Sequence, residues 1–383
     1  MAKIHIALVG GQTYPVYLGI AETSPDKVML VHSASSLAEA QRIAAEFEGS
    51  GIPFSFEQCD PVNVKQVLEK TRELSEAMGD EDQFIINLTS GTKVWSILFH
   101  EAFESKPHVQ FIYVDQNCNV YDMSSGDTMC GTTIDMNRIF KLNNTSILSC
   151  MDFGELSGDD LDAIKAIRAL HQASWLDFTR LTVSDTREKQ KMFDKSTGSY
   201  RVGDSSISWD RNDGTISFKL NTKERGIIEE TLTSPHIFDL VFNAGWFEAE
   251  VARHMSLWVH THEVKIGVEF PYVDGNSKNE IDVIVNTGQR LIFVECKTQI
   301  HNLTDLDKFS KAVHNYGGMG CIALFVTFAS MTQKALEKCQ DNDITPFSFR
   351  DTLLAASDEE KPFAIRKSLH QLLDQSLLTI NKK

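Results

Sequence analysis

The chain has 383 residues, which is longer than a single ordinary hydrophobic core supports and predicts two domains. Its formal net charge of −16 argues against a protein that coats duplex nucleic acid, because such binding depends on Lys and Arg neutralising phosphates, although it leaves room for an enzyme that grips one strand locally. The seven cysteines occur singly without a C-x-x-C pair, and no apolar run is long enough to span a membrane, so we expect a reduced, cytoplasmic protein.

From residue 3 to about 120, short β-rich runs alternate with stretches of helical spacing. The runs expected to form strands are 4–9, 28–31, 54–57, 84–88 and 109–114. The stretches expected to form helices are 37–47, 62–78 and 93–104. This alternation predicts an α/β domain with a mainly parallel, Rossmann-like sheet, which binds its ligand at the carboxyl ends of the strands.

Small and polar residues follow two of these strands, at 10–13 and at 87–93. Gly91 permits a tight turn, while Lys93 and the exposed amides at the start of the next helix offer donors and positive charge to an anion. The Walker A spacing is absent, so ATP hydrolysis is not supported. Either turn alone is also typical of an ordinary strand-to-helix connection, but the two together favour a phosphate-bearing ligand. The candidate binding residues are Gly10, Gln12, Thr13, Thr89, Gly91, Thr92 and Lys93.

The middle of the chain begins with a stretch rich in Ser, Thr, Asn and Gly at 121–150, where we expect the first domain to end. A helix is predicted over 159–181 with Ser157 as its cap, and a hairpin over 206–219 turns at 212–214. These elements form either a spacer or one wall of a catalytic cleft. The basic residues of 187–201 either bind nucleic acid, with Phe193 and Tyr200 stacking on bases, or form a solvated helix face and loop.

A helix predicted from residue 236 carries two carboxylates, Glu248 and Glu250, that lie two positions apart and therefore cannot face the same way. We expect Glu250 to face water. Further along the chain, Thr304 and Asp307 are expected to form a capping box at the start of another helix.

Between these two helices, a predicted strand containing Glu280 and Asp282 is followed, after a short turn, by an apolar strand that ends in Glu295-Cys296-Lys297. The period of two places Glu295 and Lys297 on one side of the sheet, where Asp282 can join them. Because crowded carboxylates repel each other, the cluster favours a hard divalent cation that neutralises them and activates water, with Lys297 stabilising phosphate charge. The alternative is a pair of surface strands carrying ordinary charges.

This arrangement resembles the PD-(D/E)xK nuclease superfamily, with Asp282, Glu295 and Lys297 in the motif positions and Ile281 in place of the prolyl residue. The segment 245–248 fits the G-x-x-E helix of that superfamily and Gly317-Gly318 follows the next helix as expected. The resemblance implies that Glu248 is the third catalytic acid. It also implies that Asp282, Glu295 and the carbonyl of Cys296 hold Mg²⁺ or Mn²⁺, while Lys297 positions or activates the attacking water.

The segment 87–93 resembles the signature of the CARF domains of CRISPR-associated proteins, which bind cyclic oligoadenylates. A CARF-like N-terminus joined to a PD-(D/E)xK domain is similar to type III CRISPR ancillary nucleases activated by cyclic tetra-adenylate. The resemblance implies a homodimer with the activator at the sensor interface, and a substrate of single-stranded or duplex DNA or RNA. It divides the chain into a sensor at 1–145, a linker or spacer at 146–225 and a nuclease domain at 226–383.

Two other functions remain open from the residues. One is a constitutive DNA-repair or restriction nuclease, and the other is a sensor without catalytic activity. Gln299, two residues after Lys297, would lie on the same strand face and could orient the attacking water, or it is simply a polar residue at a strand end.

Overall fold

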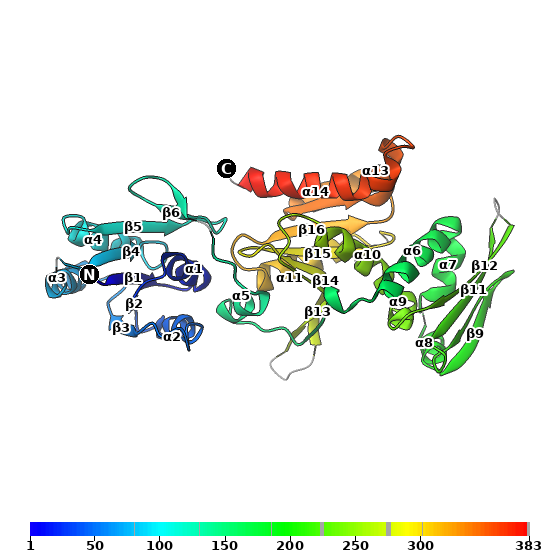
Figure 1. Ribbon diagram of the computed structural model, residues 1–383, viewed down its shortest axis with the longest axis horizontal. Helices are drawn as coiled ribbons and strands as arrows, with labels where there is room; N and C mark the ends of the chain where they lie inside the picture. The colour runs from blue at the N-terminus through cyan, green and yellow to red at the C-terminus, as the bar shows by residue number, and fades with distance from the viewer. Residues whose placement is uncertain are drawn as a thin grey trace.

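The structure is a computed structural model that describes residues 1–79, 81–129, 131–184, 186–222, 226–272, 277–300 and 302–380. Figure 1 shows three β-sheets arranged along the long axis of the molecule. They contain seven, six and four strands, and helices accompany each of them. The predicted α/β class is therefore confirmed. No helix within the described ranges is long and apolar enough to cross a membrane.

The N-terminal sheet has the strand order β3-β2-β1-β4-β5-β6-β7 and is parallel over its first five strands. Its strands are β1 (Lys3–Val9), β2 (Lys27–His32), β3 (Phe54–Gln58), β4 (Gln83–Asn87), β5 (Val109–Val114), β6 (Val120–Asp122) and β7 (Thr128–Met129). The helices are α1 (Tyr14–Thr23), α2 (Leu37–Ala45), α3 (Val64–Ala77) and α4 (Lys93–Phe103). Every strand and helix predicted before residue 120 is present.

Helix α1 was not predicted, and its sequence explains why. Eight of its ten residues are buried, so it has no polar face that would reveal a helical period. Pro15 lies in its first turn, a position that suits proline because the missing N–H has no partner there in any case. The helix begins directly after the Gly10–Thr13 turn, which places its first residues at the carboxyl edge of the sheet.

The six-stranded sheet has the order β17-β16-β15-β14-β13-β8 and lies in the middle of Figure 1. Its strands are β8 (Ser149–Asp152), β13 (Glu263–Pro271), β14 (Ser277–Asn286), β15 (Leu291–Lys297), β16 (Ile322–Thr327) and β17 (Ile344–Ser348). The associated helices are α10 (Gly245–Ser256), α11 (Thr304–Tyr316), α12 (Gln333–Asp341), α13 (Phe349–Ala355) and α14 (Lys361–Ile380). Helices α10 and α11 pack on opposite faces, and β15 is buried between them as predicted.

Helix α5 (Met136–Leu142) joins the two larger sheets into one hydrophobic core. The ring of Phe140 lies 5.2 Å from that of Phe270 on β13 and 6.2 Å from that of Phe293 on β15. The same cluster of buried residues continues into β1, α1 and β2 of the N-terminal sheet. The N-terminal domain is therefore attached to the central sheet by apolar packing in addition to the covalent link.

The third part of the molecule, which we call the middle module, contains three helices and the four-stranded sheet β12-β11-β10-β9. Its elements are α6 (Gly158–Ala173), α7 (Trp175–Thr182), α8 (Arg187–Phe193), β9 (Thr197–Val202), β10 (Ser205–Asp210), β11 (Thr215–Thr222) and β12 (Gly226–Thr233). The predicted hairpin is confirmed, because Trp209 pairs with Ile216 across β10 and β11. Ser157 caps α6 as predicted, but the expected single helix is broken at Ser174.

The basic segment at 187–201 contributes to the packing of this module. Lys189 is buried, donates to the carbonyl of Arg180 at 2.6 Å and lies 4.8 Å from the centre of the Tyr200 ring. Phe193 is only 3% exposed and cannot stack on a base. These contacts contradict the idea that both aromatic residues of the segment are available to nucleic acid.

Two further expectations about helices were wrong. The helix predicted from residue 236 is interrupted at Ala244, which has a φ of 59°, and forms α9 (Ile237–Phe242) and then α10. The N-cap of α11 is Leu303, which has no capping side chain, so Thr304 and Asp307 do not form the expected box. The Thr304 amide instead donates to Asn302 Oδ1 at 3.0 Å.

Glu250 does not face water, contrary to expectation, because it is fully buried on α10. Its carboxylate lies 2.7 Å from the guanidinium of Arg168, 3.0 Å from that of Arg253 and 3.2 Å from the ring of His254. Burial alone would raise the pKa of Glu250, but hydrogen bonds from His254 and Arg253 lower it to about 2. The ion cluster therefore fixes α10 against α6.

Replacing Glu250→Gln should lower the free energy of unfolding by about 3 kcal/mol at pH 7, because the three basic neighbours lose their shared partner. Since the folded-state pKa lies below the ordinary value of 4.5, this stabilisation is complete above pH 4.5 and is lost as the pH falls towards 2. Denaturant unfolding at pH 7 and pH 4 measures both effects. Glu229→Gln, which removes an exposed ion pair with Lys219, should change the stability by less than about 0.5 kcal/mol. Equal stability of Glu250→Gln and wild type at pH 7 would contradict the assignment.

Candidate functional sites

The motif residues of the central sheet meet where β14 and β15 diverge. The Nζ atom of Lys297 lies 2.7 Å from Glu295 Oε1 and 3.3 Å from Asp282 Oδ2. The side chains of Asp282 and Glu295 are only 12% and 14% exposed. The structure thus brings together the three residues that the strand period had predicted to converge.

Asp282 completes the hydrogen bonding of this strand end. The β14–β15 ladder runs from Asn286 opposite Leu291 to Val283 opposite Val294. Beyond that pair, Asp282 Oδ2 accepts the backbone N–H of Cys296 at 2.7 Å, so a side chain takes the role of a partner strand's carbonyl. This bond holds the carboxylate of Asp282 beside Lys297.

Two more carboxylates lie close to the cluster. Glu248, in the first turn of α10, has a pKa raised well above its usual range, first by burial and then by the charges of Asp282 and Glu280. Burial and the charge of Asp282 raise the pKa of Glu295 to about 7, and the same two causes raise that of Glu280. Burial would lower the pKa of Lys297, but Asp282 and Glu295 raise it, so this side chain is a cation at neutral pH.

The balance of charge fits a hard divalent cation. Four carboxyl groups surround one ammonium group, and carboxylate oxygens are the ligands that such ions prefer. Within the described residues, no three His, Cys, Asp or Glu side chains are already grouped as ion ligands, and Lys297 bridges Asp282 and Glu295. Glu248 and Glu280 also line a cavity of about 510 Å³ together with Asp239 and Glu269, which leaves this side of the cluster open.

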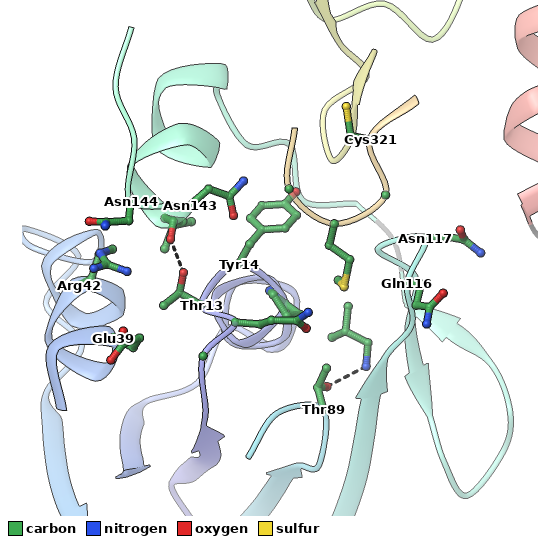
Figure 2. A pocket seen from close by; sticks show the side chains of 18 of the residues that line it. Thr13, Tyr14, Glu39, Arg42, Thr89, Gln116, Asn117, Asn143, Asn144 and Cys321 are labelled. Atoms are coloured by element: carbon green, nitrogen blue, oxygen red, sulfur yellow. Dashed lines mark hydrogen bonds between the residues drawn. The ribbon is translucent and has the colours of Figure 1, made fainter. Parts of the chain in front are cut away.

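A second candidate site is a cavity of about 840 Å³ at the carboxyl edge of the N-terminal sheet (Figure 2). Of the predicted residues, Gln12, Thr13 and Thr89 line it. The hydroxyl of Thr13 donates to the carbonyl of Leu142 at the end of α5, and that of Thr89 accepts the amide of Val114 at 2.8 Å. Both threonines therefore tie neighbouring segments together at the cavity wall.

The other predicted residues of the N-terminal domain do not line this cavity. Gly10 and Gly91 pack against each other, since a Cβ on Gly10 would lie 2.8 Å from the amide nitrogen of Gly91. Gly91 also has a φ of 83°, which favours glycine. Thr92 caps α4 and donates to the carbonyl of Pro61 at 2.8 Å. Lys93 is exposed at the start of α4, outside the cavity wall.

Several cavity residues were not predicted. Arg42 and Glu39 come from α2, and Arg42 is the only Arg or Lys among the described residues of the lining. Helix α2 follows the carboxyl end of β2, so the predicted topology already implied that α2 begins at this edge of the sheet. Asn143 and Asn144 follow α5, and the loop 318–321 comes from the C-terminal half of the chain. No sequence pattern indicated that this distant loop would reach the cavity.

The turn between β14 and β15, residues 287–290, is bound to the same region. The hydroxyl of Tyr14 donates to the carbonyl of Gln289, and the Nε of Arg290 donates to the carbonyl of Asn117. The side-chain amide of Gln289 donates to Glu22 at 2.9 Å. Tyr14 and Asn117 also line the cavity, so residues of its wall hold the strand pair that ends in Asp282 and Glu295.

The parallel sheet and the cavity at its carboxyl edge define a Rossmann-like ligand-binding domain. Residues 4–139 match the family model of the Card1 CARF domain. The N-terminal domain is thus a CARF domain of the Card1 type, as the sequence resemblance implied. No curated protein sequence matches the chain.

Solved structures resemble nearly the whole chain. One is Can2 from Sulfobacillus thermosulfidooxidans in complex with cyclic tetra-adenylate, with a TM-score of 0.63, 17% identity and coverage of 98% of this chain and 99% of that one. Another is protein VC1899 from Vibrio cholerae, with a TM-score of 0.68, 15% identity and coverage of 98% of each chain. A type III CRISPR defence DNA nuclease activated by cyclic oligoadenylate has a TM-score of 0.55 at 16% identity, covering 86% of this chain and 45% of its own. At these identities the likeness establishes a shared fold.

The electrostatic strain at the strand end makes a prediction that is independent of activity. Glu248→Gln should raise the free energy of unfolding by about 0.5–2 kcal/mol at pH 7, because the raised pKa of Glu248 means that folding must protonate this carboxyl group, a cost that the neutral amide avoids. Thermal unfolding in the presence of a chelator measures the change. Glu76→Gln, on the exposed face of α3, is the matched control and should leave the midpoint unchanged. A lower midpoint for Glu248→Gln would show that this carboxyl group stabilises the fold.

Proposed function

We propose that this protein is a metal-dependent nuclease whose activity is controlled by a cyclic oligoadenylate bound to its CARF domain. The observation that carries the proposal is the convergence of Asp282, Glu295, Lys297 and Glu248 at the end of one buried strand pair. Several partly buried carboxyl groups around a single lysine destabilise the fold, so their presence indicates a functional role. The shared fold with a CRISPR defence DNA nuclease supports the same reaction class.

In this proposal Asp282, Glu295 and the carbonyl of Cys296 hold Mg²⁺ or Mn²⁺, with Glu248 nearby. The ion supplies a water of lowered pKa and neutralises the carboxylates. Lys297 remains protonated at neutral pH, so it stabilises negative charge developing at phosphorus and orients water, rather than accepting a proton. Nucleic acid, single-stranded or duplex, is the substrate class.

The activator proposal rests on the CARF match and on the cavity in Figure 2. The related Can2 structure contains cyclic tetra-adenylate, and the cavity here offers Arg42 and several amide side chains to phosphate and base edges. A ring with repeated chemistry is naturally bound by two identical sites, so we propose a homodimer with the activator across the sensor interface. We assign the sensor to residues 1–145, the linker and spacer to 146–225 and the nuclease domain to 226–383, with two strands crossing these bounds: β12 pairs with β11 of the middle module, and β8 pairs with β13 of the central sheet.

The bound turn at 287–290 provides a direct route between the two sites. Activator that moves Tyr14 or Asn117 displaces the hydroxyl that donates to the carbonyl of Gln289, or the carbonyl that accepts from the guanidinium of Arg290. Asp282 lies four residues before Asn286, the last residue of β14, or about 13 Å along the strand. The activator therefore changes activity to the extent that it binds the two arrangements of this strand pair with different affinities.

Asp282→Ala and Glu295→Ala should each lower activator-dependent cleavage by about a hundredfold or more, because each removes a proposed ligand of the ion. Cleavage of labelled DNA and RNA strands is measured with Mn²⁺, with and without cyclic tetra-adenylate. Activator affinity, measured by calorimetry, should be unchanged in both variants, and Glu101→Ala on the exposed face of α4 serves as the control. Near-normal cleavage by either variant would overturn the site, and equal wild-type cleavage without activator would make the enzyme constitutive.

Arg42→Ala should weaken cyclic tetra-adenylate binding by about tenfold to a hundredfold, since a charge-assisted hydrogen bond to phosphate is lost. The activator concentration for half-maximal cleavage should rise by the same factor, while saturating activator restores full cleavage. Arg72→Ala removes the same charge from an exposed position on α3 and should have no effect. Unchanged calorimetric affinity of Arg42→Ala would remove this residue from the activator site.

A further inference from the structure

A cavity of about 730 Å³, which we call the Trp175 cleft, lies between the middle module and the central sheet. His171 and Trp175 approach it from the junction of α6 and α7, and Arg350 and Lys361 from α13 and α14. The remaining wall includes Gln299 and Phe328, which follow β15 and β16. None of these cleft residues was needed to build the carboxylate cluster.

The cleft begins where the motif strand ends. The backbone N–H of Phe328 donates to the carbonyl of Lys297 at 3.1 Å. Gln299 follows Lys297 by two residues, so their Cα atoms are at most about 7 Å apart. A polynucleotide whose scissile phosphate lies at Lys297 would place its adjoining nucleotide in this cleft.

The charge of the cleft suits a phosphate backbone. Its lining includes Arg350 and Lys361 and, among the described residues, no Asp or Glu. Lys361 also forms an ion pair with Asp358, whereas Arg350 is exposed and, within the described part of the chain, its guanidinium interacts only electrostatically with the neighbouring Asp351. The cavity on the Glu248 side is lined by four acidic residues instead. In a chain with a net charge of −16, the Trp175 cleft is a locally basic wall beside the motif residues.

Trp175 offers an aromatic surface to the cleft. Trp175 is the first residue of α7 and is 48% exposed. Tryptophan is highly buried on average, so packing in a core does not explain this exposure. Indole faces stack on nucleobases irrespective of base identity. A base that is already paired and stacked in a duplex cannot make this contact, so the surface suits an unpaired strand.

His171 is the second, independent indication of a ligand. It is 2% exposed, yet neither ring nitrogen has a hydrogen-bond partner. Its ring packs against those of Trp246 and Phe328, and burial lowers its pKa to about 4, so the neutral ring presents one donor and one acceptor. A buried polar group without a partner is unfavourable, and the polar edge of a nucleobase would satisfy it.

We propose that the Trp175 cleft is a nucleobase subsite that holds an unpaired base of the substrate strand next to the scissile phosphate. Trp175 stacks on the base, His171 meets its polar edge and Arg350 contacts the backbone phosphate. The proposal rests on the proposed nuclease function, which it extends by placing the strand and by favouring unpaired substrates.

The test measures binding in the full-length Glu295→Ala variant, so that cleavage does not interfere. A fluorescein-labelled strand of eight thymidines is titrated by anisotropy in the presence of cyclic tetra-adenylate. Adding Trp175→Ala should weaken binding about tenfold to a hundredfold, whereas Trp175→Phe should retain most of the affinity. Leu176→Ala, an exposed apolar residue on the same helix that does not line the cleft, is the matched control and should bind like the parent.

A strand of the same length without bases separates stacking from charge. On this abasic strand the parent should bind more weakly, and Trp175→Ala should cause no further loss. Arg350→Ala should weaken binding of both strands and reduce the slope of log affinity against log salt by about 0.7. Unchanged thymidine binding by Trp175→Ala, or an equal loss on the abasic strand, would overturn the base subsite.

The two proposals fail in different ways. If the protein with Glu295 intact does not cut with Mn²⁺ and activator while thymidine binding still depends on Trp175, the nuclease function is overturned and the subsite stands. If that protein cuts but Trp175→Ala binds and cuts like wild type, the subsite is overturned and the nuclease stands.

Discussion

The strand pair β14–β15 is the constraint on which both sites depend. Its turn is fixed by Tyr14 and Asn117 of the N-terminal domain, and its opposite end carries Asp282 and Glu295. Between these ends the strands are buried on both faces, so the pair cannot bend freely in a closely packed interior. A displacement of the turn is therefore transmitted along the strands instead of being absorbed by loops.

Helix α10 shows how the same residue type stabilises the fold at one position and, in the proposed function, takes part in the nuclease site at another. Glu250 is surrounded by Arg168, Arg253 and His254, which favour its ionised form. Glu248, two positions earlier, is surrounded by carboxylates that oppose ionisation. The first environment stabilises the fold, while the second is unfavourable without a counter-charge, which the proposed cation would supply. The charges of the neighbouring side chains, more than burial itself, account for the opposite pKa shifts of the two glutamates.

The sequence predicted the features that follow from short-range periodicity. Alternating strands and helices gave the N-terminal sheet, and the period of two brought Glu295 and Lys297 together beside Asp282. The sequence did not reveal that Glu250 is buried in an ion cluster, because its three basic partners lie on two helices. How those helices pack against each other depends on the tertiary structure. The sequence also missed α1, whose burial removes the helical pattern, and the loop 318–321 in the wall of the sensor cavity.

That loop gives the cavity a wall from each half of the chain, and this limits how the proposed activator could act. Gly320 lies so close to the sensor that a Cβ would be 3.1 Å from Cys118 Sγ and 3.2 Å from the carbonyl oxygen of Gln116. The loop leads directly into β16, which is paired with β15 as far as Thr327 opposite Lys297. A ligand that fills the cavity would therefore contact the loop that leads into β16, and would contact Tyr14 and Asn117, which hold the turn that leads into β15. Because these segments are tightly packed, they can adopt only a small number of discrete arrangements. The ligand would favour the arrangement that it binds most tightly.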